Sequence, residues 1–430
     1  MRAPARIRPA SLLRHLPTAR GCAVVRDGTT TVIGVEPAAI RRASGEASFD
    51  VLREVDAGGF WVGYCAYDLG RAIERVTNRT DDDLAIPDVA FARYDTRLVI
   101  HDDGELEVIG EQGVRTLVEA AVRAATDIDS DAPQSLPAID QWSSSLDRVD
   151  HAAACARVLE LLRAGECYQV NITRRLTAPG TPDPIALYDA LARVNPSPHA
   201  SLCIVPGDGT SDAARDLAIV SASPELFLRI EPDTEGGRRI ESRPIKGTAA
   251  DAAALAASAK DRAENVMIVD LTRNDLGRVC EFGSVQVPAL CSVEQHPGLY
   301  HLVSTVTGRL RAEVDLADVV RATFPPASVT GAPKPRVMQA IEDLEPVRRG
   351  VYCGAVGWVD ADRGRAELAV AIRTFLLVGS RAAGTTHLGV GGGIVADSQP
   401  DDEWAETELK AARLLRAVGT HRTTVSLGAP

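Results

Sequence analysis

The stretch LAIVSASPELFLRI, residues 217–230, contains two apolar runs separated by Ser223 and Pro224. Short apolar runs on either side of turn residues predict two β-strands about a turn. YQVNITRRL (168–176) alternates like a strand, and VIHDDGELEVIG (99–110) predicts a hairpin around an Asp-Gly pair. Strands are therefore expected in both halves of the chain.

Helical patterns lie between these strands. Val158, Leu161 and Leu162 have the spacing of an amphipathic helix that ends near Gly165. Strands in both halves that are joined by helices predict an α+β fold, in which large sheets are flanked by helices.

The composition divides the chain into three regions. Residues 1–125 are expected to form a sheet-rich N-terminal subdomain, in which GGFWVGYCAYDLG (58–70) has a strand-like pattern. Residues 126–145 are polar, with two prolines and several Ser and Asp, and are expected to be a linker. Residues 146–420 form the third region, in which strands and helices are mixed.

Charge and cysteine usage exclude several classes of protein. A net charge of -12 and a pI near 5.3 argue against nucleic-acid binding. No apolar run approaches the roughly 18 residues that span a membrane. The eight cysteines contain no C-x-x-C pair, which indicates a reducing cytoplasm rather than a zinc site or a disulfide framework. The arginine-rich, acid-free segment 1–21 resembles a transit peptide, but Arg and Ala are common throughout the chain.

Lysine is rare in this chain. Of 47 basic residues, only Lys246, Lys260, Lys334 and Lys410 are lysines. Arginine stays protonated, whereas a lysine amine can lose its proton when it is desolvated or lies near other cations, and can then act as a nucleophile. The lysine in RPIKGT (243–248) is therefore a candidate for chemistry, with an ordinary surface charge as the alternative.

Two predicted helices carry pairs of acids. Asp261 and Glu264 are three residues apart, and Glu403 and Glu406 repeat that spacing, with Lys410 one turn beyond. Two such pairs could hold a divalent cation such as Mg²⁺, which takes one or two carboxylates together with waters and an anionic ligand. The alternative is a solvated helix surface on which Glu406 and Lys410 form an i, i+4 pair.

A glycine run follows in GVGGGIVAD (389–397), where backbone amides could approach an anion closely. It does not match a nucleotide motif, because the G-x-G-x-x-G spacing is broken at Ile394 and no P-loop sequence occurs. H-E-x-x-H and G-x-S-x-G are also absent, which removes the usual signatures of zinc proteases and serine hydrolases. A turn at a strand end that binds no ligand is the alternative.

Eight motifs resemble, in order, those of the chorismate-utilising enzymes, a family that includes anthranilate synthase component I, aminodeoxychorismate synthase component I, and the isochorismate and salicylate synthases. They are GECYQVN (165–171), SASPELF (221–227), RPIKGT (243–248), DRAENVMIVDLTRNDLGR (261–278), HLVSTVTG (301–308), SVTGAPKPR (328–336), AIRT (371–374) and GGGIVADS (391–398). The resemblance implies one α/β sandwich on two large antiparallel sheets. In it the N-terminal part is interwoven with a chorismate-binding catalytic region at 146–420.

The resemblance implies a magnesium ion. Glu264 and Glu406 correspond to the family's ligands, and Asp261 and Glu403 occupy supporting positions. Chorismate is a dicarboxylate, and a cation would allow a site lined with glutamates to hold its ring carboxylate.

The resemblance also implies a substrate site. Tyr352 and Arg373 would hold the enolpyruvyl carboxylate, Arg373 through a bidentate fork. The remaining substrate-binding positions are the backbone amides of Gly391, Gly392 and Gly393, together with Thr248 and Lys410.

Glu225, in SASPELF, matches the family's general acid, which protonates the departing 4-hydroxyl of chorismate. That role requires a protonated carboxyl near neutral pH, so we expect burial to raise the pKa of Glu225. His301 matches a histidine near the same hydroxyl, where an orienting role is implied.

Two positions distinguish members of the family. Isochorismate and salicylate synthases carry a water-activating lysine where this chain has Gln169, so water addition is disfavoured. At the position of Lys246, anthranilate synthases resemble R-P-I-A-G-T, whereas aminodeoxychorismate synthases commonly carry lysine. The implied reaction is attack of Lys246 on ring carbon 2 and then of ammonia on carbon 4, which gives 4-amino-4-deoxychorismate for 4-aminobenzoate and folate synthesis. An ion pair without covalent chemistry is the alternative for Lys246.

The implied reaction needs a source of ammonia. Family members take it from a glutamine amidotransferase, and the chain shows no glycine-rich elbow with a Cys and His pair, so a separate glutaminase partner is expected. The Leu-Leu-Glu-Ser signature of tryptophan feedback in anthranilate synthases is not matched by Ser11-Leu12-Leu13-Arg14. Anthranilate synthase component I is still the nearest alternative, followed by a chorismate-binding subunit without activity.

Overall fold

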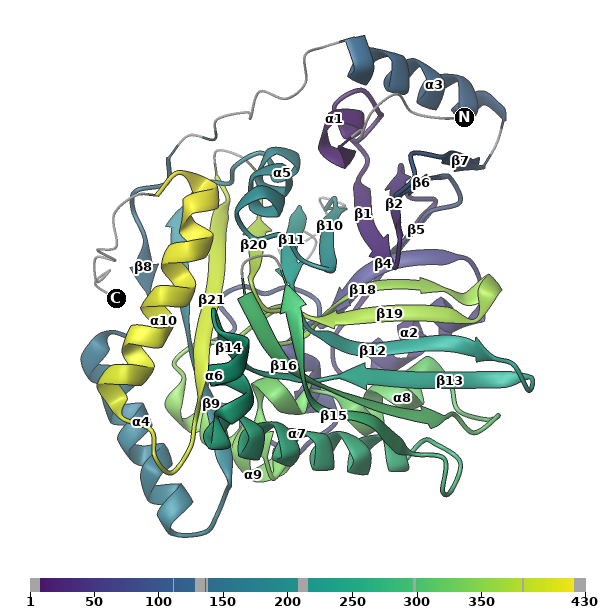
Figure 1. Ribbon diagram of the computed structural model, residues 1–430. Coiled ribbons are helices and arrows are strands. Elements are labelled where there is room, and N and C mark those ends of the chain that lie inside the picture. The colour runs from purple at the N-terminus through teal and green to yellow at the C-terminus, as the bar shows by residue number, and fades with distance from the viewer. Residues whose placement is uncertain are drawn as a thin grey trace.

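Two large antiparallel sheets form the frame of the protein. The computed structural model describes residues 8–110, 112–127, 136, 138–207, 216–296, 299–380 and 383–420. Residues 1–7 of the arginine-rich segment, and residues 128–135 and 137 of the predicted linker, lie outside the described residues. Within the described part, one sheet has 11 strands and the other has 10, and helices flank both (Figure 1). The predicted α+β fold is confirmed.

The 11-stranded sheet combines strands from both ends of the chain. Its order is β17 (Gly331–Ala332), β9 (Gln169–Pro179), β21 (Thr385–Ile394), β20 (Thr374–Val378), β11 (Leu217–Ser223), β10 (His199–Val205), β1 (Cys22–Asp27), β2 (Thr30–Val35), β6 (Arg97–His101) and β7 (Leu106–Ile109), with β8 (Ser143–Ser144) paired to β9. Strands β6 and β7 form the predicted hairpin, and β9 is the strand expected at 168–176.

The 10-stranded sheet carries the other half of the frame. Its order is β14 (Ile245–Ala249), β16 (Leu299–Arg309), β13 (Gly237–Arg243), β12 (Leu226–Asp233), β19 (Arg365–Val370), β18 (Ala355–Asp360), β4 (Phe60–Cys65), β5 (Val89–Arg93) and β3 (Ala39–Ala43), with β15 (Gln286–His296) paired to β16. In Figure 1, β12, β13, β18 and β19 run across the view, whereas β9 and β21 of the first sheet run up it.

Helices cover the outer faces of the sheets. They are α1 (Pro9–Leu13), α2 (Ala47–Ala57), α3 (Gln112–Asp127), α4 (Arg148–Arg163), α5 (Pro184–Val194), α6 (Ala252–Ala257), α7 (Ala259–Gly277), α8 (Leu316–Thr323), α9 (Lys334–Leu344) and α10 (Pro400–Leu415), with short 3-10 turns η1 (Tyr67–Ala72), η3 (Ala327–Val329), η4 (Ala361–Arg363) and η5 (Arg416–Val418). Helix α10, yellow in Figure 1, lies along β21, and α7 packs on β16. None of the described helices is long and apolar enough to cross a membrane.

The stretch 217–230 passes from one sheet to the other. Strand β11 pairs with β10 and β20 in the first sheet, whereas β12 pairs with β13 and β19 in the second. The predicted strands are confirmed, but they do not pair with each other. Pro224 and Glu225 occupy the crossover, and the Ser223 hydroxyl donates to the Val370 carbonyl of β19. This bond ties the crossover to the second sheet.

The segment 58–70 is a strand in its first half only. Strand β4 ends at Cys65, and η1 follows from Tyr67. The Asp68 carboxylate accepts a hydrogen bond from the Gly350 amide at 2.8 Å. This contact joins residues far apart in the sequence and stabilises η1, so the local strand pattern could not predict it.

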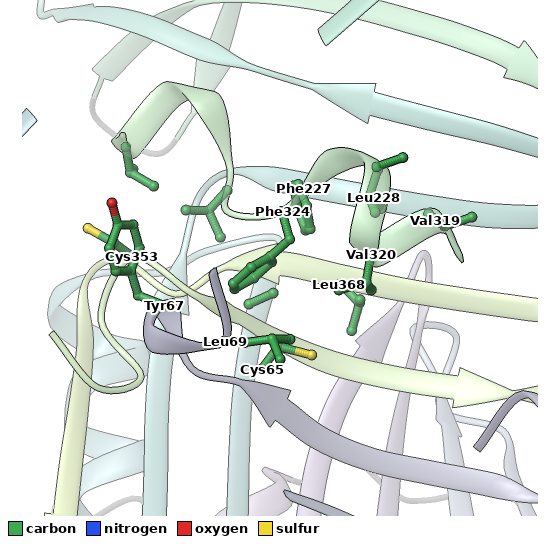
Figure 2. Packing of buried hydrophobic residues seen from close by; sticks show 14 of the residues in the cluster. Cys65, Tyr67, Leu69, Phe227, Leu228, Val319, Val320, Phe324, Cys353 and Leu368 are labelled. Carbon is green, nitrogen blue, oxygen red and sulfur yellow. The ribbon is translucent and has the colours of Figure 1, made fainter. Parts of the chain in front are cut away.

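Apolar side chains fill the space on both sides of the sheets. One cluster lies between the two sheets and includes Val25 and Ile219 from the first and Val62 and Trp358 from the second. Another packs behind β12, where the Phe227 and Phe324 rings meet edge to face with centroids 6.0 Å apart (Figure 2). Such aromatic pairs add roughly 1 kcal/mol beyond their buried area. The crossover at Glu225 therefore rests on a packed core.

Candidate active site

Lys246 lies on β14, at the end of the 10-stranded sheet. A bulge between Lys246 and Thr248 interrupts the pairing of β14 with β16, and Gly247 within it has a φ of +73°. A methyl group on Gly247 would lie 2.8 Å from the Asp261 Cγ atom, so α7 packs directly against the bulge. The Lys246 Nζ atom lies 3.7 Å from the Glu264 Oε2 atom, with side chains only 14% and 16% exposed.

The acids of α10 lie near the glycine run of β21. Glu403 is buried and accepts a hydrogen bond from Ser398 Oγ at 2.6 Å. Burial raises the pKa of Glu403, although the bond from Ser398 opposes the shift. The Glu406 carboxylate is half exposed and lies 2.6 Å from Lys410 Nζ, so the i, i+4 pair considered from the sequence is present. Lys410 Nζ also donates to the Gly391 carbonyl at 2.7 Å.

The glycine run lies close both to these acids and to Lys246. A methyl group on Gly392 would lie 3.0 Å from Glu403 Oε2 and 3.9 Å from Glu406 Oε1, whereas one on Gly393 would lie 3.5 Å from Lys246 Nζ. Burial opposes a lower pKa for Glu406, but the positive charges of Lys410 and Lys246 lower it, so the amine of Lys246 acts on this acid across the glycine run. The distance to Lys246 is an ordinary contact, whereas the distance to Glu403 is tight, so the close approach is that of the acid to Gly392.

The four predicted acids therefore form two groups. Asp261 and Glu264 of α7 lie at the β14 bulge, and Glu403 and Glu406 of α10 lie at Gly392. Over the described residues, no three acidic, His or Cys side chains meet closely enough to form a metal centre by themselves. One or two carboxylates are enough for Mg²⁺ when water and an anionic ligand complete its six positions, so the donor set fits that ion.

Glu225 is buried at the crossover between the sheets. Its Oε1 atom accepts a hydrogen bond from the Ile245 amide at 3.5 Å, which places the carboxyl beside the strand that carries Lys246. Burial raises the pKa of Glu225 to about 7, against the opposing effects of Ser328 and of the positive charges of Lys246 and Arg373. The raised pKa expected from the sequence is confirmed.

His301 lies on β16 directly opposite Thr248. The imidazole is buried, and its Nδ1 atom lies 2.9 Å from the Thr248 hydroxyl. The two predicted residues are therefore in contact, and the hydroxyl holds the ring orientation.

Tyr352 and Arg373 lie on adjoining segments. The Tyr352 ring fills the space above Gly389, where an added methyl group would come within 2.1 Å of the ring. The Cys353 amide donates to the Ala371 carbonyl at 3.0 Å, which joins the tyrosine turn to the segment that leads to Arg373. The pKa of Arg373 is lowered to about 10, chiefly by burial and then by the positive charge of Arg413.

Gln169 adds a feature that the sequence did not reveal. Its side chain is fully buried, and neither amide atom has a hydrogen-bond partner among the described residues. A methyl group on Gly393 would lie 2.4 Å from Gln169 Nε2, so the amide faces the same point of β21 as Lys246. An unpaired buried amide costs about 1–3 kcal/mol. A ligand that pairs with Gln169 would recover part of that cost.

Comparison with known proteins identifies the family. A family model described as chorismate binding enzyme matches residues 23–416. The chain belongs to this family. Aminodeoxychorismate synthase component 1 of Salmonella typhimurium is 37% identical over 366 residues, which cover 82% of this chain and 75% of the relative. Anthranilate synthase component 1 of Thermus thermophilus is 37% identical over 416 residues, which cover 92% of this chain and 86% of the relative.

A solved structure agrees with the assignment of this chorismate-binding enzyme. Anthranilate synthase component I of Streptococcus pneumoniae superposes with a TM-score of 0.75 at 26% identity, covering 97% of this chain and 99% of that one. Relatives with two different names are thus equally similar in sequence. The choice between them depends on individual site residues.

Proposed function

We propose that this chorismate-binding enzyme is an aminodeoxychorismate synthase component 1, which converts chorismate and ammonia to 4-amino-4-deoxychorismate. The main support is that a lysine amine and a buried carboxyl of raised pKa share one site. Glu225 Oε1 lies 3.5 Å from the amide of Ile245, the residue before Lys246. A nucleophile and an acid in this relation suit an allylic displacement.

In the proposed first step, the neutral Lys246 amine attacks ring carbon 2. Both ring double bonds shift, from carbons 1–2 and 5–6 to carbons 1–6 and 4–5, the bond from carbon 4 to oxygen breaks, and Glu225 gives its proton to the departing hydroxyl, which leaves as water. The new secondary ammonium then loses one proton. Because burial raises the pKa of Glu225 to about 7, the protonated acid is available near neutral pH.

In the second step, ammonia attacks carbon 4, both double bonds shift back to carbons 1–2 and 5–6, and the bond from carbon 2 to nitrogen breaks. Lys246 leaves as an amine after taking up a proton on nitrogen, and the new amino group loses one. The net reaction of chorismate and ammonia yields aminodeoxychorismate and water. Thr248 and His301, which contact each other, would orient the 4-oxygen.

Carboxylate binding is proposed for the remaining residues. Glu264 and Glu406 would hold Mg²⁺, with Asp261 and Glu403 in support, and the ion when bound would supply positive charge for the ring carboxylate. The amides of Gly391, Gly392 and Gly393, with Lys410, would line the same end of the substrate. Tyr352 and Arg373 would hold the enolpyruvyl carboxylate.

Ammonia is proposed to come from a glutamine amidotransferase subunit. The Salmonella relative is named a component 1, which supports a partner component for this chain as well. The buried amide of Gln169 lacks a titratable group, which supports an ammonia rather than a water nucleophile.

Anthranilate synthase component 1 is the second candidate, because the Thermus thermophilus relative is just as identical. The products separate the two activities. Chorismate, Mg²⁺ and ammonium should give a product that keeps its enolpyruvyl ether. Fluorescent anthranilate with release of pyruvate would contradict the proposal, and tight chorismate binding without turnover would indicate an inactive subunit.

Lys246→Ala and Lys246→Arg test the covalent step. Both variants should lose the mass adduct that forms on incubation with chorismate, and both should lose activity. Arginine preserves the positive charge beside Glu264 but cannot act as the amine nucleophile. Normal activity in Lys246→Arg would mean that only the ion pair at 3.7 Å matters.

A further inference from the structure

Helix α10 presents a fourth charged residue on its acid face. Glu403, Glu406, Lys410 and Arg413 follow one another at intervals of three and four residues, which places them along one side of the helix. The bonds from Lys410 Nζ to Gly391 and Glu406 show that this side lies along β21. Arg413 lies one turn further along the same side.

The Arg413 guanidinium has no partner within the described part of the chain. It is half buried, yet no described carboxylate or carbonyl forms an ion pair or hydrogen bond with it. Another arginine that contacts α10 is fully paired, because Arg174 binds Glu408 and Thr407. A half-buried cation without a counter-ion is unusual in a chain that pairs most of its arginines.

Arg373 is a second cation of the same kind. It too has no ion pair or hydrogen bond to its guanidinium among the described residues, and its backbone has a φ of +52°, in the left-handed region that non-glycine residues rarely occupy. The nearby charge of Arg413 contributes to the lowered pKa of Arg373. Strand β20 begins at the next residue, Thr374, and pairs with β21, over which α10 lies.

The Glu225 carboxyl attracts Arg373 and Arg413 repels it, and an anion bound between the two guanidinium groups would remove that repulsion. We propose that Arg413 binds, together with Arg373, the enolpyruvyl carboxylate of chorismate, so that this carboxylate lies between two guanidinium groups. The inference rests on the proposed role of Arg373. Arg413 would then favour a dicarboxylate substrate over one that carries the ring carboxylate alone.

Equilibrium binding of chorismate tests this role. The measurements use Lys246→Ala protein with Mg²⁺ and without ammonium, so that no covalent step contributes. Arg413→Ala and Arg413→Gln should each weaken chorismate binding about tenfold. Arg413→Lys should weaken it less, because lysine keeps the positive charge but cannot form the two parallel hydrogen bonds of a guanidinium group. Arg416→Ala, which removes an exposed arginine of η5, should have no effect.

A double-mutant cycle with Arg373→Ala shows whether the two residues share one carboxylate. If they do, the double variant should bind much more tightly than the product of the two single losses predicts. The inference would be overturned if the losses of affinity in the two single variants simply multiply in the double variant. It would also be overturned if chorismate binds normally to both Arg413→Ala and Arg413→Gln, or if it binds normally to Arg373→Ala. The identity of the reaction product does not enter this test, so failure of the proposed function would be seen separately, as anthranilate in the product assay.

Discussion

Glu225→Gln should make the protein more stable and, at the same time, inactive. Burial raises the pKa of Glu225 from 4.5 to about 7. Below pH 4.5 the carboxyl is protonated in the folded and unfolded chains alike, so it contributes no pH dependence. Between pH 4.5 and 7 the unfolded chain loses the proton more readily, so the folded state loses relative stability as the pH rises. Above pH 7 the penalty is constant.

The size of the penalty follows from the difference between the two pKa values. About 2.5 pH units at 1.36 kcal/mol each correspond to about 3 kcal/mol at pH 8, and to less than about 1 kcal/mol at pH 5. Glutamine has nearly the same shape and no charge, so Glu225→Gln should raise the free energy of unfolding by up to that amount at pH 8. A catalytic acid held in an apolar site is expected to reduce stability in this way.

Urea unfolding at pH 5 and pH 8 provides the assay. The gain in stability should be several times larger at pH 8 than at pH 5, while turnover of chorismate is lost at both. Glu107→Gln, a substitution at an exposed glutamate of β7, should show neither effect. A gain that is equal at the two pH values, or a loss of stability at pH 8, would refute the argument that burial keeps Glu225 protonated.

Three further measurements test the site and its support. The value of kcat/KM should rise with pH and level off near pH 7, because above that pH the loss of protonated Glu225 offsets the gain in uncharged lysine amine, and a profile that keeps rising tenfold per pH unit to pH 9 would contradict this. Gly389→Ala would bring a methyl group within 2.1 Å of Tyr352, so KM for chorismate should rise several-fold, and an unchanged KM would remove Tyr352 from the substrate site. Glu345→Gln should lower stability by about 3 kcal/mol in urea unfolding, because it leaves the buried Arg349 without its carboxylate, and a loss below about 1 kcal/mol would show that the pair is dispensable.

The site depends on polar contacts as well as on its charged residues. Asn265, the residue after Glu264, is fully buried on α7, accepts a hydrogen bond from Ser304 Oγ, and donates to the Leu302 carbonyl at 3.3 Å. These contacts fix the rotation of α7 on β16, and with it the direction of Glu264. They belong to the fold and carry no signal in the local sequence.

Local sequence patterns were sufficient to predict several strands and helices and to identify the candidate reactive side chains. Apolar periodicity predicted β9, the β6–β7 hairpin and the strands on either side of Pro224, because these depend on which side chains alternate along a short segment. The scarcity of lysine drew attention to Lys246, and the paired acids indicated α7 and α10. Motifs in order identified the family.

Relations between distant segments required the folded chain. The strands of 217–230 separate into two sheets, and this separation buries Glu225 and raises its pKa. The glycine run brings the acids of α10 and the amine of Lys246 to the adjacent residues Gly392 and Gly393, and the charges of Arg373 and Arg413 interact because α10 lies over β21. Burial and charge proximity are sums over neighbours in space, and a linear pattern of residues does not contain them.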